Sequence, residues 1–321
     1  MHTTKEYLDI IETRISDPGL PSSPAGLYQP IIYALSCGGK RLRPVLTLAS
    51  AEAFCGDPMR AVNQALAVEM FHNFTLLHDD VMDHADMRRG KPTVHRRWNE
   101  RTAILSGDAM LTYSNILLCR GTTADTLPKL LEMMNKTAME VYEGQQLDMD
   151  FEQRTDVTTG EYMEMIRLKT SVLLGCACAL GAIAGGASED ALRAMYGYGE
   201  KLGLAFQLQD DYLDTFGDPL VFGKEIGGDI LNDKKTWLLI TALAEDKDGI
   251  LRHEIESPSA PAEKIERVRK VYTALDLPAR CHKLIDTYVD EAIASLDNAG
   301  LTPAARDFFA AIADKSRTRT H

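Results

Sequence analysis

The chain has 321 residues, with 35 Lys and Arg against 47 Asp and Glu, so its formal net charge is −12. Apolar residues make up 45% of it, which allows a substantial core and excludes global disorder. The acidic balance argues against a protein that binds nucleic acid by neutralising phosphates over a broad face. Six cysteines without a C-x-x-C pair are too few for a disulfide scaffold, so we expect reduced thiols and a cytoplasmic protein.

Neither a signal peptide nor a membrane span is expected. The first residues, MHTTKEYLDIIETRISD, contain no apolar core of the signal-peptide kind. Residues 170–188 are uncharged, but Ala, Gly and Cys dominate them rather than Leu, Ile and Phe. Gly181 and Gly185 stand four residues apart there. This spacing of small residues favours a buried helix against which neighbouring helices pack closely.

Almost every periodic segment predicts a helix, since Leu, Ala, Met, Glu and Lys abound and alternating β-branched runs are missing. In chain order, helices are expected near residues 3–16, 27–37, 41–55, 59–83, 99–119, 127–150, 159–185, 189–216, 233–245, 261–275, 278–298 and 302–316. Segments rich in Gly, Pro and Ser separate several of them, and none resembles an interdomain linker. The sequence therefore predicts one all-α domain over residues 1–321, built as a large helical bundle.

Two motifs of the form D-D-x-x-D follow apolar helical stretches, at residues 79–83 and 210–214. With 27 aspartates in the chain, chance gives about 0.2 such motifs per sequence. Residues four apart stack on one face of a helix, and two like charges there are destabilising. A counter-charge is therefore expected, and paired carboxylates suit Mg²⁺, which takes its remaining ligands from water and substrate phosphates.

Basic residues accompany both motifs. They lie in GGKRLRP (38–44), in RRGKP (88–92), at Lys169 before the uncharged helix, and at Lys224, Lys234 and Lys235 around the glycine-rich segment 217–228. Arginine forks fit phosphate oxygens, and lysine provides a mobile positive charge. Each basic group alone is typical of a solvated surface, but together with the aspartates they indicate a site for phosphorylated substrates.

These motifs resemble those of the trans-polyprenyl diphosphate synthases, of the farnesyl and geranylgeranyl diphosphate synthase type. The resemblance rests on GGKRLRP, LLHDDVMDHADMRRGKPTVH, GQQLD, Lys169-Thr170, FQLQDDYLD, GKEIGGDI and KKT, in this order along the chain. One departure is the lack of the proline that follows the family's K-x-T-L, since Trp237 and Leu238 follow Thr236 here. The resemblance implies the isoprenoid synthase fold, with helices around a deep central cavity, and a homodimer.

The resemblance also implies a role for each matching residue. The implied Mg²⁺ ligands are Asp79, Asp83 and Asp210, with Asp214 in support, for about three ions per site. The implied binding residues for isopentenyl diphosphate are Lys40, Arg43, His72 and Arg89. The implied contacts to the allylic diphosphate and its leaving group are Arg88, Lys169, Thr170, Gln207, Lys224 and Lys234.

The implied reaction is a condensation of an allylic diphosphate with isopentenyl diphosphate. Cations and Mg²⁺ stabilise the departing diphosphate, the double bond of isopentenyl diphosphate attacks the allylic cation, and a proton is lost. An apolar pocket must exclude water, and segment 217–228 is a candidate lid. Lone pairs of Thr170, Gln207 and the carbonyl of Lys169 are expected to stabilise the cation.

The product length is expected to depend on side chains below Asp79. A rise of 1.5 Å per residue places Phe74 about 7.5 Å and Phe71 about 12 Å deeper, and we expect both near the face of Asp79. By resemblance, an aromatic residue five positions before the first Asp indicates C15 or C20 products. Small Thr75 and a motif without insertion favour C20, that is geranylgeranyl over farnesyl diphosphate.

Two other functions are weighed against this prenyltransferase. A terpene cyclase shares the first motif, but it would carry N-D-x-x-S-x-x-x-E in place of the second, and a second diphosphate pocket would be superfluous. A non-catalytic helical subunit of a heteromeric synthase predicts damaged aspartates or a missing Lys and Arg pocket, and the sequence has neither defect.

Overall fold

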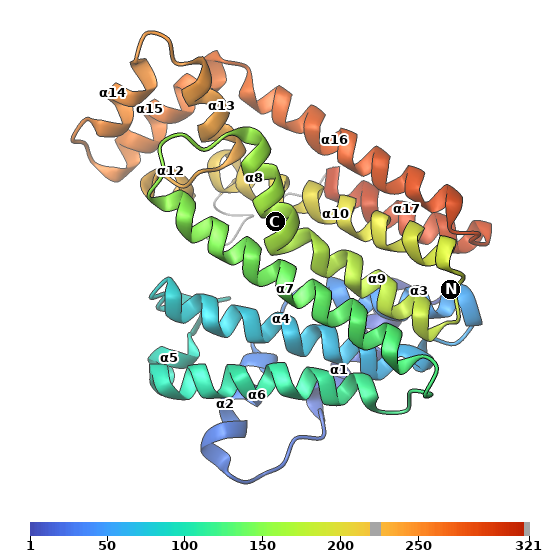
Figure 1. Ribbon diagram of the computed structural model, residues 1–321. Helices are drawn as coiled ribbons and strands as arrows, with labels where there is room; N and C mark the ends of the chain where they lie inside the picture. The colour runs from blue at the N-terminus through green and yellow to red at the C-terminus, as the bar shows by residue number, and fades with distance from the viewer. Residues whose placement is uncertain (219–225, 318–321) are drawn as a thin grey trace. The chain divides into compact units, whose positions relative to one another are not determined.

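The computed structural model describes residues 1–218 and 226–317 (Figure 1), and these residues are overwhelmingly helical. They form two compact units, one of Met1–Lys136 with Cys176–Tyr196 and the other of Thr137–Gly175 with Gly197–His321. Among the described residues, the only strands are two of two residues each. The all-α prediction is thus confirmed.

Unit 1 is built on a long central helix, α4, whose Leu66, Met70 and Phe71 are fully buried. α4 lies along α6 and also packs on α3 (Figure 1). The elements that lie wholly in this unit are α1 (Thr4–Ser16), α2 (Ala25–Ser36), α3 (Leu42–Cys55), η1 (Pro58–Ala61), α4 (Val62–Met82), β1 (Met87–Arg88), β2 (Lys91–Pro92), α5 (Val94–Arg97) and α6 (Glu100–Cys119).

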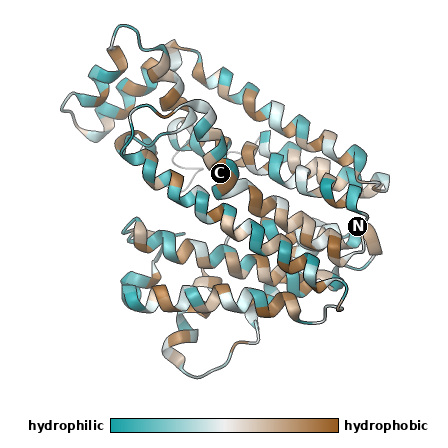
Figure 2. Cartoon of the chain, in the orientation of Figure 1, coloured by the Kyte–Doolittle hydropathy of each residue, from teal (hydrophilic) through white to brown (hydrophobic). Residues whose placement is uncertain are grey.

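Three helices contribute residues to both units: α7 (Leu127–Glu152), α9 (Val172–Ala184) and α10 (Glu189–Phe216). Unit 2 further contains α8 (Thr159–Ile166), the π-helical turn η2 (Arg167–Ser171), α12 (Gly228–Leu231), α13 (Trp237–Glu245), α14 (Ile250–Glu256), α15 (Pro261–Ala274), α16 (Leu277–Ser295), η3 (Leu296–Asn298) and α17 (Pro303–Arg317). In its core, α10 packs on α17 where the Tyr198 hydroxyl donates to the Phe309 carbonyl at 2.8 Å. Brown and teal residues alternate along α16 (Figure 2), as expected of a helix with one buried face.

Most predicted helices are confirmed, and α10 has the predicted bounds. Two predictions need correction. The stretch predicted as one helix over 159–185 is three segments, because a π-helical turn interrupts it at η2. The helix predicted from residue 233 begins only at Trp237, where Thr236 caps it by accepting from the Leu239 N–H. The β1–β2 hairpin and the short helices α5, α12 and α14 were not predicted.

Gly181 and Gly185 serve close helix packing, as predicted. A Cβ at Gly181 would overlap the Thr47 carbonyl of α3, and one at Gly185 would lie 2.8 Å from the Ala51 carbonyl oxygen. The Thr47 hydroxyl donates to the Ala177 carbonyl at 2.9 Å across the same contact. Within the described residues, one stretch, Thr159–Ala184, is long and apolar enough to cross a membrane, and 83% of its most apolar window is buried. Such burial is typical of a core helix.

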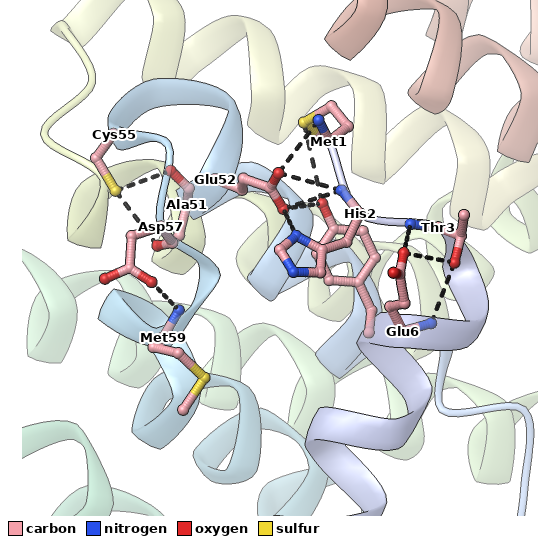
Figure 3. A network of polar contacts seen from close by, with 10 residues as sticks. Met1, His2, Thr3, Glu6, Ala51, Glu52, Cys55, Asp57 and Met59 are labelled. Atoms are coloured by element: carbon pink, nitrogen blue, oxygen red, sulfur yellow. Dashed lines mark hydrogen bonds and ion pairs between the residues drawn. The ribbon is translucent and has the colours of Figure 1, made fainter.

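A polar network ties α1 to α3 (Figure 3). The carboxylate of Glu52 accepts from the His2 backbone N–H at 3.1 Å and from the Tyr7 hydroxyl at 2.6 Å. Thr3 and Glu6 form a reciprocal capping box at the start of α1. Together these contacts hold α1 in a defined position in unit 1.

Candidate active site

The first aspartate motif lies at the end of α4. Asp79 is in the last turn, and Asp83 is the C-terminal cap, whose N–H donates to the Asp79 carbonyl at 2.8 Å. Asp80 lies on another side of the helix and is only 4% exposed. The Arg88 Nε donates to Asp80 Oδ1 at 2.7 Å, and Arg88 Nη2 lies 3.4 Å from Asp79 Oδ2. Arg88 therefore lies against the first two aspartates of the motif.

A hairpin that the sequence did not predict positions the arginines. β1 pairs antiparallel with β2, and the two turn residues, Arg89 and Gly90, have φ values of 52° and 73°. Positive φ at both positions defines the tight turn that matches strand twist. Arg88 lies against α4, while Arg89 at the turn donates to the Gly38 carbonyl. The short Arg-Gly turn before Lys91-Pro92 is a weak sequence signal for this hairpin.

Three of the four residues predicted to bind isopentenyl diphosphate share one locality of unit 1. Arg43 Nη1 lies 3.5 Å from His72 Nε2, and the Arg89 guanidinium fills the space beside Gly39, where a Cβ would lie 2.7 Å from its Nη1. Both arginines act electrostatically on His72. Lys40 follows Gly39 and is exposed. The locality thus combines two guanidinium groups with an imidazole, a set suited to phosphate oxygens.

Neighbouring Arg41, unlike these cations, is buried and bound to carboxylates of the protein itself. Its side chain is buried, with Nε 2.8 Å from Glu12 Oε1 and Nη1 2.6 Å from Glu69 Oε1. Its own φ is 49°, which turns the chain at the start of α3. Arg41 therefore holds α1, α3 and α4 together.

His72 is neutral near neutral pH. Desolvation by burial and then the charges of Arg43 and Arg89 lower the pKa of its imidazole well below the usual value. A neutral imidazole beside two arginines still offers an N–H donor to a phosphate oxygen without adding a third charge.

The depressed pKa predicts an acid-sensitive stability. Because the unfolded state protonates His72 near pH 6.5 and the native state does not, stability is full above that pH and falls as the pH drops below it. Between pH 7.0 and 5.5, His72→Gln should lose about 1 kcal/mol less than the parent protein, as measured by urea denaturation. Equal losses in both proteins would contradict the assignment.

The aromatic residues of α4 form a row. The rings of Phe71 and Phe74 are 5.4 Å apart, and those of Phe74 and His78 are 4.8 Å apart. His78 Nε2 lies 3.1 Å from the Ile104 carbonyl of α6. Phe74 is therefore on the α6 side of the helix, not near the Asp79 face as expected, because five residues at 100° each turn it well away. Thr75, four residues before Asp79, lies on that face.

In unit 2, the π-helical turn η2 presents Lys169 and Thr170. Two glycines allow neighbouring helices to approach it: a Cβ at Gly144 of α7 would overlap the Lys169 N and lie 2.7 Å from its Cα, and one at Gly203 of α10 would lie 2.5 Å from the Ser171 Cα. The extra residue in a π turn redirects side chains, and such turns are frequent at functional sites. Gly144, the first residue of the GQQLD segment, and Gly203 are thus part of the site's framework, a packing role that the sequence did not predict.

The side chains of η2 are held by partners in α7 and α10. Lys169 Nζ lies 2.5 Å from Asp148 Oδ2 of the GQQLD segment. The Thr170 hydroxyl donates to Gln207 Oε1 at 3.0 Å, and Gln207 Nε2 donates to Asp211 Oδ1 at 2.9 Å. The structure therefore joins the predicted residues Lys169, Thr170 and Gln207 to Asp148 and Asp211, two aspartates of the quoted motifs to which no role was assigned.

The second aspartate motif ends α10 and is tied to α12. The Asp214 carboxylate accepts from the Asp229 N–H at 2.9 Å, and its carbonyl accepts from the Gly227 N–H at 2.7 Å. Asp214 thereby orders α12, whereas Asp210 lies one turn earlier on the same face of α10. Burial, and then the charge of Asp229, raise the pKa of Asp211 to about 7.

Lys234 lies among these carboxylates. Its Nζ is 3.7 Å from Asp229 Oδ1. Burial alone would lower its pKa, but the charges of Asp229, Asp211 and Asp148 outweigh this and raise it. The ammonium is therefore charged at any physiological pH. Lys224, predicted to contact the leaving group, and most of the candidate lid lie outside the described residues.

The donor chemistry suits a hard cation. Asp79 and Asp83 in unit 1, and Asp210 in unit 2, offer only carboxylate oxygens, the ligands that Mg²⁺ prefers. Over residues 1–218 and 226–317, no group of three or more His, Cys, Asp or Glu side chains is gathered to hold an ion by itself.

Comparison with known proteins identifies the family. The family model described as polyprenyl synthetase matches residues 24–275. The short chain isoprenyl diphosphate synthase of Methanothermobacter thermautotrophicus is 40% identical over 77% of each chain, and the geranylgeranyl pyrophosphate synthase of Geoglobus acetivorans is 36% identical over 99% of this chain and 98% of the relative. The geranylfarnesyl diphosphate synthase of Natronomonas pharaonis is 38% identical over 75% of each chain.

Solved structures that resemble this chain support the same family. A crystal structure of a geranylgeranyl pyrophosphate synthase is 42% identical, covers 100% of both chains and has a TM-score of 0.94. That of the Corynebacterium glutamicum enzyme, solved with isoprenyl diphosphate and magnesium, is 28% identical, covers 98% of this chain and 96% of its own, and has a TM-score of 0.83. The chain therefore belongs to the polyprenyl synthetase family: it is a prenyltransferase with the isoprenoid synthase fold.

Proposed function

We propose that the enzyme condenses isopentenyl diphosphate head to tail with an allylic diphosphate and releases a linear trans-prenyl diphosphate of C15–C20, with geranylgeranyl favoured over farnesyl. The carrying observation is that unit 1 holds two sets of cations: Arg43 and Arg89 beside His72, and Arg88 against Asp79 and Asp80. Cations in excess of those that one diphosphate needs suit two diphosphate substrates. A terpene cyclase needs only one, and a non-catalytic subunit needs neither.

We assign the basic and polar residues to two substrates. Lys40, Arg43, Arg89 and His72 would hold isopentenyl diphosphate, while Arg88, Lys169 and Lys234, together with Lys224, would bind the allylic diphosphate and stabilise its departure. On binding, a phosphate would displace Asp148 as the partner of Lys169. Thr170 and Gln207 would direct oxygen lone pairs at the developing cation, and the released diphosphate would accept the proton.

We further propose Mg²⁺ as the cofactor, with about three ions per site held by Asp79, Asp83 and Asp210 and supported by Asp214. When bound, Mg²⁺ supplies Lewis-acid stabilisation of the leaving diphosphate. Magnesium in the Corynebacterium glutamicum structure and the all-carboxylate donor set support this assignment.

We also propose a homodimer, a single domain over residues 1–321 and a cytoplasmic location. Ile104, Leu105 and Ile116 of α6 are 46%, 59% and 44% exposed, and a second copy would cover these apolar side chains. The free thiols at Cys37, Cys55, Cys119, Cys178 and Cys281 agree with a reducing compartment. Sedimentation velocity checks the dimer, and a monomer at micromolar concentration would contradict it.

Product length is proposed to depend on Phe74, Phe71 and Thr75. Phe74 supports Phe71 by ring contact, so its removal would let Phe71 rotate and deepen the pocket below Thr75. Phe74→Ala is expected to shift the main product by at least one five-carbon unit, as measured by chromatography of the dephosphorylated alcohols. Thr13→Ala on the exposed face of α1 is the control. An unchanged product distribution in Phe74→Ala would contradict the proposal.

The direct test of function uses purified protein, Mg²⁺, labelled isopentenyl diphosphate and, separately, C5, C10 and C15 allylic diphosphates. Linear C15 or C20 alcohols after dephosphorylation are the expected result. Cyclic hydrocarbons formed without isopentenyl diphosphate would indicate a cyclase. No turnover with any primer would favour the non-catalytic subunit.

A further inference from the structure

A continuous set of hydrogen bonds joins four side chains of unit 2. Tyr162 of α8 donates its hydroxyl to Asp211 Oδ2, and Gln207 Nε2 donates to Asp211 Oδ1 at 2.9 Å. The Thr170 hydroxyl of η2 completes the set by donating to Gln207 Oε1 at 3.0 Å. Tyr162 is 2% exposed and Asp211 5%, so two members of the network are buried in the protein.

The network determines which way the Gln207 amide points. Both oxygens of the ionised Asp211 carboxylate accept hydrogen bonds, so the nitrogen end of the amide faces them. The oxygen end then faces Thr170, whose hydroxyl has one proton and gives it to that oxygen. The oxygens of Thr170 and Gln207 therefore have only lone pairs left, which can accept hydrogen bonds but cannot donate them.

We propose that Asp211 and Tyr162 are positioning residues that hold the oxygen end of Gln207 toward Thr170, so that this pair presents lone pairs and not N–H groups to the allylic cation. The inference rests on the proposed function, which places Thr170 and Gln207 beside that cation. Oxygen lone pairs stabilise a developing positive charge, whereas an amide N–H opposes it. Neither Asp211 nor Tyr162 needs to touch the substrate.

Asp211→Asn tests the orientation. The Tyr162 phenol donates more strongly than it accepts, so the asparagine oxygen turns to that hydroxyl, and its amino group then faces position 207 and requires an oxygen there. Gln207 must then turn its nitrogen toward Thr170. We expect kcat to fall about 100-fold while KM for isopentenyl diphosphate is unchanged. A loss confined to KM would overturn the proposal. Asp190→Asn, at the exposed start of α10, is the matched control.

Exchanging the acid and the amide provides the decisive variant. In D211N/Q207E, Asn Nδ2 can donate to the glutamate, Thr170 can donate to its other oxygen, and Tyr162 can donate to the asparagine oxygen. Glutamate has no N–H end, so lone pairs face outward again. We expect kcat at least about ten times that of D211N. A double variant no faster than D211N would overturn the proposal.

Tyr162→Phe distinguishes a positioning role of Tyr162 from a contribution to protein stability alone. Without the hydroxyl, Asp211 can rotate and hold Gln207 less well, so we expect kcat to fall about tenfold. Tyr198→Phe removes another buried hydroxyl bond, to the Phe309 carbonyl, and is expected to lower the melting temperature without lowering kcat. If Tyr162→Phe behaves as Tyr198→Phe does, the positioning role is overturned.

The failure of this inference is distinguishable from the failure of the proposed function. Parent protein that forms linear prenyl diphosphates, together with a D211N/Q207E variant that is not rescued, overturns only the positioning role. Parent protein that forms none with C5, C10 or C15 primers overturns both.

Discussion

Asp79→Asn is expected to lower kcat for prenyl transfer about 1,000-fold, because it removes a metal-binding charge while keeping the side-chain volume. The Asp83 carboxylate one turn on cannot replace it, since the predicted magnesium site uses both members of the i, i+4 pair. The loss should appear in single-turnover assays with labelled isopentenyl diphosphate. Chelation of divalent cations should give a comparable loss in the parent protein, reversed by excess Mg²⁺.

The control for Asp79→Asn is Asp9→Asn, which removes an exposed aspartate of α1. It should leave kcat and the melting temperature unchanged, since exposed substitutions rarely cost more than about 0.5 kcal/mol. Retention of more than about a tenth of the parent kcat in Asp79→Asn would contradict the assignment of Asp79 as a metal ligand. The melting temperature of Asp79→Asn should stay close to that of the parent, because relief of the like-charge pair with Asp83 offsets the weakened contact with Arg88.

Gly144→Ala is expected to destabilise the protein by about 3 kcal/mol and to lower the melting temperature by about 5–10 °C. The added Cβ would overlap the backbone N of Lys169 and lie 2.7 Å from the Leu168 carbonyl carbon. Backbone atoms cannot turn aside as a flexible side chain can, so α7 and η2 must separate. The gain in helix propensity, about 1 kcal/mol, offsets only part of this cost.

The control for Gly144→Ala is Gly160→Ala in α8, where the nearest atom to the new Cβ would be the Thr158 Oγ1 at 3.9 Å. It should be neutral or slightly stabilising, since it restricts the unfolded chain without steric conflict. Differential scanning calorimetry of the two variants measures the contrast. Equal melting temperatures would show that η2 yields to the added methyl group at little cost.

Residue pattern alone predicts the long helices, the two aspartate motifs and the close packing of α9. α10 was predicted over its observed range because apolar positions recur along it and acidic residues begin it. The role of Gly181 and Gly185 also followed from local spacing. These features depend on residues within a few turns of one another, so period and residue type suffice to predict them.

The pairing of polar side chains, in contrast, becomes visible only in the folded protein. Arg41 and Arg43 are two residues apart, yet Arg41 is bound to Glu69, 28 residues away, while Arg43 lies beside His72. Tyr162 and Asp211, 49 residues apart, form a bond for which the sequence has no signal. The β1–β2 hairpin and the π turn η2 were likewise missed. The physical reason is that partner choice and local deviations from helix geometry depend on how helices pack, and packing joins residues whose separation along the chain carries no periodic pattern.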